Sequence, residues 1–110
     1  MKLISAVIRP DKIEHVCDAL EHLGVAGLTV SEVRGYGRKR TSLYGVSNDA
    51  LRSLARLKLE VAVPDEIAKR ASEAIIAAAQ TGRPGDGKIF VLDLAEIVRI
   101  RTRETGIEAL

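Results

Sequence analysis

Apolar residues along the chain follow two alternating spacings, which predict strands and helices in turn. Residues 2–8 form a short run rich in Ile, Val and Leu, as is typical of a buried strand. A helix is then predicted to open at Pro10, where a missing N–H does no harm, and to end at Gly24. Its buried face follows the i, i+3, i+4, i+7 spacing of Ile13, Val16, Cys17, Leu20 and Leu23. A second strand is predicted over about residues 28–35.

The second half of the chain repeats this order of elements. Leu57–Val63 alternates so that every second residue is apolar and faces one side of a strand. A Pro-Asp pair again opens a helix, which is predicted to break at Gly82. Its expected buried face consists of Ile67, Ala71, Ala74, Ile75 and Ala78. Residues 88–94 are predicted to form the fourth strand, and residues 98–101 a short further extension.

This order predicts an α+β fold of the ferredoxin-like type, a split βαβ sandwich with the order βαββαβ. Such a fold has an antiparallel four-stranded sheet, two helices on one face and here a long loop between strands 2 and 3. The uncovered sheet face is expected to carry its own Ile and Leu residues and to pack against another copy of the chain. At 110 residues, the chain is expected to form a single domain.

Composition narrows the class of protein. The hydrophobic share of 46% favours a globular rather than a disordered chain, and a net charge of +2 does not indicate a large nucleic-acid surface. No apolar run approaches the ~20 residues that span a bilayer, and the first residues read directly into a strand, so a cytoplasmic protein is expected. Cys17 is interpreted as a small core residue, and His15 and His22 as surface residues rather than metal ligands.

The glycine-rich run 81–88 is the first candidate binding site. Three glycines leave much of its backbone uncovered, so that N–H groups can approach a phosphate chain, and Lys88 adds a positive charge. The run is not a P-loop, because a strand rather than a helix follows it. An ordinary glycine-rich turn is the alternative. Arg99 and Arg101 favour phosphate binding, since an extended segment would place both guanidinium groups on one face.

Residues 36–55, called the arm below, form an unusually long connection for a compact domain. The arm is basic and also carries apolar residues. This combination favours contact with a partner protein, and the alternative is a simple helical hairpin tip. The candidate contact residues are Arg40, Leu43, Tyr44 and Leu51.

These runs resemble the PII signal-transduction family from Met1 to about Thr102. The strongest match is 81–94 (TGRPGDGKIFVLDL), followed by 98–102 (VRIRT) and 28–38 (LTVSEVRGYGR). The resemblance implies a homotrimer that binds ATP or ADP, with AMP a further candidate, in clefts between subunits. It also implies that the arm docks onto a channel, transporter, enzyme or transcription factor, so that any membrane association occurs only through the target.

The resemblance also implies roles for single residues. Those around the phosphates would be Gly35, Gly37, Arg38, Gly85, Asp86, Gly87 and Lys88, with Arg99 and Arg101 from the adjacent subunit. Those along the adenine would be Val7, Thr29, Glu60 and Ala62. The segment 99–110 would be the C-terminal loop and tail.

The chain departs from the family pattern at two positions that matter chemically. Lys39 replaces a glutamine that holds Mg²⁺ together with ATP and 2-oxoglutarate, and a cation there would repel the metal, so Mg²⁺ is not expected. Arg56 replaces a lysine that contacts 2-oxoglutarate. Both are candidates for binding a second small anion. The region of the family's uridylylated tyrosine reads Val46-Ser47-Asn48-Asp49-Ala50 and holds no tyrosine.

The resulting prediction is a divergent PII-like regulator that reports energy or nutrient state through the arm. The alternatives are a bicarbonate-linked regulator of inorganic carbon uptake and a nitrogen regulator of the usual kind. An RNA-binding module of the RRM type shares the element order, but Phe90 is the only phenylalanine and the central strands lack a stacking platform. Catalysis is not expected, because no tuned base stands beside a nucleophile.

Overall fold

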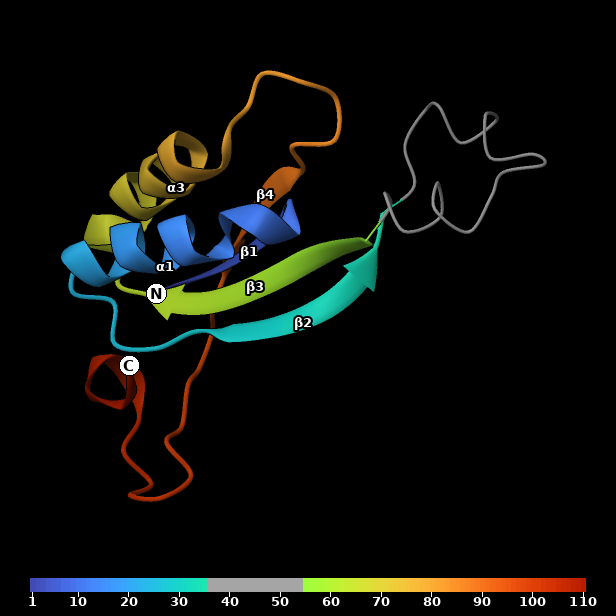
Figure 1. The fold of residues 1–110 in the computed structure, drawn as a ribbon. Helices are drawn as coiled ribbons and strands as arrows, with labels where there is room; N and C mark the ends of the chain where they lie inside the picture. Colours follow the sequence, from blue (N-terminus) through green and yellow to red (C-terminus); the bar gives the residue numbers. More distant parts are fainter. Residues whose placement is uncertain (36–54) are drawn as a thin grey trace.

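The computed structural model describes residues 1–35 and 55–110, and these form a two-layer α+β sandwich (Figure 1). The ferredoxin-like order βαββαβ is confirmed, with the strands paired antiparallel in the order β2-β3-β1-β4. The strands are β1 (Lys2–Ile8), β2 (Thr29–Arg34), β3 (Ala55–Val63) and β4 (Lys88–Asp93). The helices are α1 (Ile13–His22) and α3 (Asp65–Ala79), with short 3₁₀ turns η1 (Pro10–Lys12) and η3 (Gly106–Ala109).

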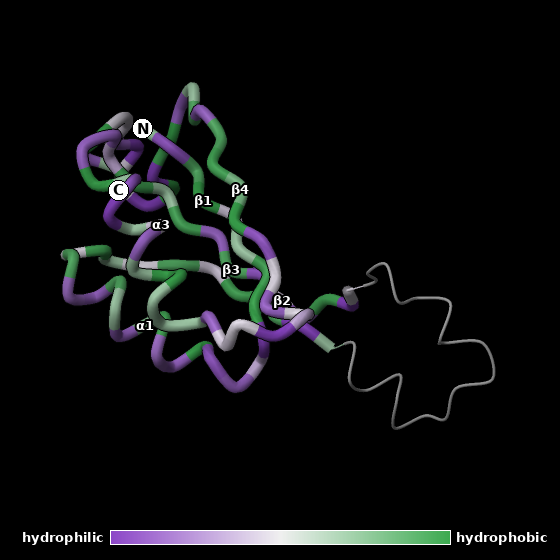
Figure 2. The backbone as a smooth tube through the Cα atoms, turned by 90° about the horizontal axis from the view of Figure 1, so that it is seen from above, coloured by the Kyte–Doolittle hydropathy of each residue, from purple (hydrophilic) through white to green (hydrophobic). Residues whose placement is uncertain are grey.

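Both helices cover the same face of the sheet, as the two views show (Figures 1 and 2). The pairing sets this face, because Ile4 stands opposite both Val61 on β3 and Val91 on β4. Alternate residues on the two central strands therefore point toward the helices and are buried. The largest fully buried side chains of this core are Ile4, Ile8, Leu20, Leu59, Ile75, Val16 and Val63.

The helix boundaries differ slightly from those predicted. Pro10 begins a 3₁₀ turn, and the α-helix starts only at Ile13. Gly24 ends α1 as predicted, since its φ of 81° lies in the left-handed region and its N–H bonds to the Glu21 carbonyl at 2.9 Å. The second helix ends at Ala79, before Gly82, because Gln80 is already extended. Its predicted core residues Ala74 and Ala78 are only half-buried, whereas Ala68 and Ala79 are buried.

The histidines of α1 are exposed, as predicted, whereas Cys17 is only partly buried and does not belong to the buried core. Within residues 1–35 and 55–110, no cluster of three His, Cys, Asp or Glu side chains could hold a metal ion. In the same residues, no helix is both long and apolar enough to cross a membrane.

The open face of the sheet differs from the prediction. The isoleucines of the strands, including Ile4 and Ile89, point toward the helices, so the prediction of Ile on the open face is wrong. Its apolar residues come from leucine, valine, alanine and Phe90, whose side chain is 51% exposed. The central strands place no aromatic residue on this face, because β1 offers Leu3, Ser5 and Val7 there, and β3 offers Arg56, Lys58, Glu60 and Ala62.

The segment after β4 folds back on itself instead of extending. Val98 forms an isolated bridge with Thr105, and the Arg99 N–H bonds to the Glu104 carbonyl at 2.9 Å. Residues 100–102 form the turn between them, and Arg103 has a φ of 64°. The predicted extension over 98–101 is therefore wrong: the segment is a tight hairpin.

Candidate phosphate-binding site

Asp86 closes the glycine loop, the segment 81–87 between α3 and β4. Its carboxylate accepts hydrogen bonds from the Thr81 N–H at 2.8 Å, from the Thr81 hydroxyl at 2.5 Å and from the Gly82 N–H at 2.9 Å. Three donors from the start of the loop thus converge on one side chain near its end. The loop is a folded unit rather than a loose turn. The Asp86 carboxylate is bound within the loop, and its place beside phosphates stays a prediction.

Arg9 binds the same loop from the end of β1. Its Nε donates to Asp86 Oδ1 at 3.0 Å, and its terminal nitrogen donates to the Pro84 carbonyl at 2.6 Å. Arg9 itself is extended, at φ −65° and ψ 137°, because the next residue is Pro10. The Thr81 hydroxyl and then the Arg9 guanidinium hold the pKa of Asp86 well below its usual range. The loop is therefore held by a carboxylate that is ionised at neutral pH.

All three glycines of the loop have a positive φ, and at two of them a β-carbon would also meet a neighbouring group. Gly85 and Gly87 both have φ of 98°, a conformation that other residues rarely adopt. A β-carbon on Gly85 would lie 2.7 Å from a terminal nitrogen of Arg56 and 3.3 Å from one of Arg9. The absence of side chains thus lets two guanidinium groups approach the loop backbone.

Arg56 connects the loop to the base of the arm. Its Nε donates to the Gly85 carbonyl at 3.2 Å, and its NH1 donates to the Ala55 carbonyl at 2.7 Å. Its Cγ also lies 3.4 Å from the place of a β-carbon on Gly35, at the other end of the arm. Arg56 was predicted as a candidate for a second anion, and its position beside the glycine loop keeps that prediction open.

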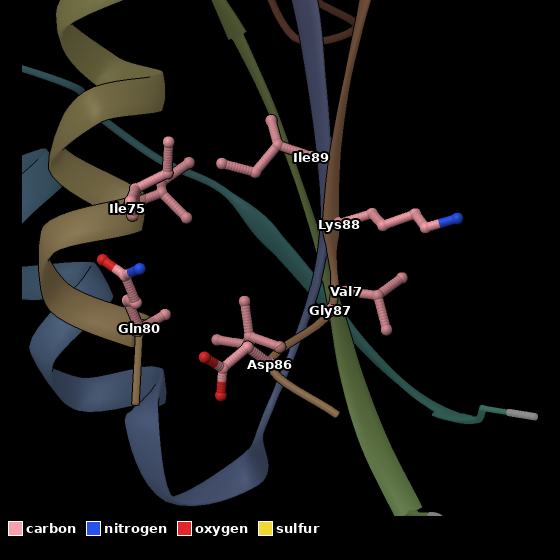
Figure 3. A pocket seen from close by; sticks show the side chains of 10 residues that line it. Val7, Ile75, Gln80, Asp86, Gly87, Lys88 and Ile89 are labelled. Atoms are coloured by element: carbon pink, nitrogen blue, oxygen red, sulfur yellow. The ribbon is translucent and has the colours of Figure 1, made fainter. Parts of the chain in front are cut away.

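A cleft of about 400 Å³ lies between α3 and β4, beside the glycine loop (Figure 3). Ile75 and Ile89 form its apolar wall, and Asp86 and Gly87 form its loop end. Figure 3 shows that Lys88 and Val7 point away from α3. This agrees with the β1–β4 register, in which the two residues are cross-strand partners and so share one face of the sheet. The Lys88 ammonium is therefore presented on the open face of the sheet, next to the loop.

The predicted adenine residues divide between two places. Thr29, Glu60 and Ala62 line a second cleft of about 370 Å³, whereas Val7 lines the first. Ala62 stands opposite Leu3 of β1, and Lys88 stands opposite Val7 of β1. Leu3 and Val7 are four residues apart, which is roughly 13 Å along the strand. In a single chain, Val7 lies beside the loop and Lys88, whereas Ala62 in the second cleft does not. Glu60 in the second cleft also pairs with Lys58 at 3.3 Å.

Arg99 and Arg101 do not form the parallel pair that the sequence suggested. Arg99 binds Glu104 at 3.3 Å and the Leu110 carbonyl at 2.9 Å, which ties the hairpin to the tail. Arg101 lies in the exposed turn of the hairpin. The two-residue spacing predicted one shared face only for an extended strand, and the turn at 100–102 removes that condition.

Several predicted residues lie outside the described part of the chain: Gly37, Arg38, Lys39, Arg40, Leu43, Tyr44 and Leu51. Sequence reasoning missed Arg9 and Thr81, which hold the loop, and Lys58, which pairs with Glu60. A signal for Arg9 was available. Arg9 directly follows β1, and β1 pairs with β4, the strand after the glycine loop. The end of β1 and the end of the loop must therefore meet.

The fold and the loop together define a small ferredoxin-like protein with a folded glycine loop at the edge of its sheet. Residues 1–104 match the family described as nitrogen regulatory protein P-II. A nitrogen regulatory protein P-II of Rhizobium etli is 50% identical over the whole of both chains, and one of Rhizobium meliloti is 47% identical over the same extent. Nitrogen regulatory protein P-II 1 of Escherichia coli is 46% identical, again over both full lengths. The chain belongs to the P-II family, and the resemblance seen in the sequence is confirmed.

Proposed function

We propose that this protein is a nitrogen-signalling regulator that binds ATP or ADP at the glycine loop and reports the bound state through its arm. The observation that carries the proposal is the glycine loop itself: a folded backbone turn, with Lys88 beside it and two arginines bound to its carbonyl groups. Such a loop offers backbone N–H groups and positive charge to a phosphate chain.

The relatives favour the nitrogen-regulatory alternative over the divergent energy-sensing or carbon-linked reading. They carry the name nitrogen regulatory protein P-II and match over their full lengths. The substitution at Lys39 remains a reason to expect a different response to Mg²⁺ and 2-oxoglutarate. We place the protein among regulators rather than catalysts on the same family grounds.

A homotrimer supports this function because the two predicted half-sites lie apart in one chain. Residues of the second cleft, Thr29, Glu60 and Ala62, would meet the loop and Lys88 of a neighbouring copy. The half-exposed Phe90 and Leu92 on the open face offer apolar surface for that contact. Arg101, in an exposed turn, would reach the phosphates from the neighbouring chain.

Calorimetric titration with adenosine, AMP, ADP and ATP tests the proposal. Affinity should rise with each phosphate, because the loop and its cations contact the phosphates. Repeating the ATP titration with bicarbonate tests the carbon-linked reading, which predicts that bicarbonate changes the affinity for ATP. The proposal is wrong if neither ADP nor ATP binds, or if adenosine binds as tightly as both.

A further inference from the structure

We infer that Arg9 and Arg56 are positioning residues, which orient two peptide groups of the glycine loop so that their N–H groups face a bound phosphate. The inference rests on the proposed nucleotide binding and adds the device that shapes the binding loop. Neither arginine needs to touch the nucleotide for this role. Both side chains donate to loop carbonyls.

The first step concerns the Pro84–Gly85 peptide. Arg9 donates to the Pro84 carbonyl at 2.6 Å, which fixes the direction of that oxygen. In a trans peptide, the carbonyl of one residue and the N–H of the next point in opposite directions. The Gly85 N–H is therefore turned away from the Arg9 guanidinium.

The second step repeats this at the next peptide. Arg56 Nε donates to the Gly85 carbonyl at 3.2 Å, so the following N–H, that of Asp86, is turned away from Arg56. Within the described residues, the N–H groups of Gly85 and Asp86 have no hydrogen-bond partner. The loop thus offers two successive, unoccupied N–H groups, the arrangement that binds anions.

The third step concerns the anchor of Arg9. Asp86 holds Arg9 Nε at 3.0 Å and is itself held by Thr81, and both charged side chains are less than a quarter exposed. This pairing uses the fork geometry of a guanidinium, with one nitrogen on the carboxylate and another on a carbonyl. Lysine has the charge but not the fork, so it cannot hold both partners in this geometry.

Arg9→Lys is the deciding variant, with Arg70→Lys on the exposed side of α3 as the matched control. ADP and adenosine are titrated into wild type and both variants. Arg9→Lys should weaken ADP binding roughly tenfold, the worth of one charge-assisted hydrogen bond, and leave adenosine unchanged. Arg70→Lys should behave as wild type. If Arg9→Lys binds ADP as wild type does, charge alone suffices and the inference is wrong.

Two further measurements separate orientation from folding. In ¹H–¹⁵N spectra, ADP should shift the Gly85 and Asp86 amide signals of wild type strongly downfield, and the Gly85 shift should be lost in Arg9→Lys. Unmoved signals in a wild type that binds ADP would overturn the inference. If Arg9→Lys does not fold, Thr81→Val and Thr81→Ser decide: only Val should lose ADP affinity, because Ser keeps the hydroxyl that holds Asp86. Equal affinity in both Thr81 variants would contradict the inference, whereas failure of wild type to bind ADP would contradict the proposed function itself.

Discussion

Gly87 lies against Val7 so closely that a β-carbon on Gly87 would be 1.7 Å from the Val7 carbonyl oxygen. The end of the glycine loop is therefore placed directly on the backbone of the central strand β1. No side chain can be accommodated by a rotamer change, because the opposing atom belongs to the backbone. This contact fixes where the loop enters β4, and so where Lys88 emerges from the sheet.

Gly87→Ala should lower the free energy of unfolding by more than about 3 kcal/mol, because it adds backbone overlap to an unfavourable φ. Gly24→Ala is the matched control, since Gly24 also has a positive φ but has open space around it. That control should lose only about 1–2 kcal/mol. Urea denaturation of both variants measures the difference. Equal losses at the two positions would mean that the loop moves away from β1 easily.

Asp86 should make stability depend on pH in acid. Its folded pKa is lowered, first by the Thr81 hydroxyl and then by Arg9. A lowered folded pKa contributes stability that is fully present above the unfolded value of about 3.9 and is lost as the pH falls below it toward the folded value. Wild type should therefore exceed Asp86→Asn in stability by a constant amount between pH 7 and pH 5. That margin should shrink by pH 3, as measured by urea denaturation at each pH. A margin that stays constant down to pH 3 would show that Asp86 is not ionised and paired.

Lys88 and Arg101 should act on the same phosphates from different chains. Lys88→Ala and Arg101→Ala should each weaken ADP binding by ~1.5–3 kcal/mol and leave adenosine unchanged. The sharper test mixes the two variants by joint refolding and counts nucleotide per trimer. Mixed trimers contain interfaces at which one chain supplies Lys88 and its neighbour Arg101, so part of the high-affinity binding should return.

Light scattering on the same samples checks the assembly on which this reasoning depends. A stable monomer at micromolar concentration would contradict the inter-subunit site. A trimer without recovered binding in the mixture would mean that both residues act within one chain.

The helices and strands and their order could be predicted from the sequence. Burial of one helix face and burial of one sheet face repeat apolar residues at different spacings along the chain. The three glycines identified the loop as a candidate binding site, but the sequence did not predict the hydrogen bonds that fold the loop. Asp86 was expected at the phosphates. Its bonds to Thr81 span only five positions, but its bond to Arg9 joins residues 77 positions apart. The Arg99–Arg101 spacing misled for the opposite reason. It assumed a strand, and the turn after Arg99 is set by tail contacts that no short period reveals.

Lys39 provides the last prediction, which rests on the sequence alone because this residue lies outside the described part of the chain. An ammonium at the position of a Mg²⁺-binding glutamine removes one oxygen ligand and adds positive charge beside the metal. Mg²⁺ requires oxygen ligands in near-octahedral geometry and does not accept an ammonium. We therefore expect 2-oxoglutarate not to raise Mg-ATP affinity in wild type and to do so in Lys39→Gln. Titration of Mg-ATP with and without 2-oxoglutarate measures the coupling in both proteins. Coupling of about tenfold in wild type, or ~1.4 kcal/mol, would show that the metal is held without the glutamine and that the prediction is wrong.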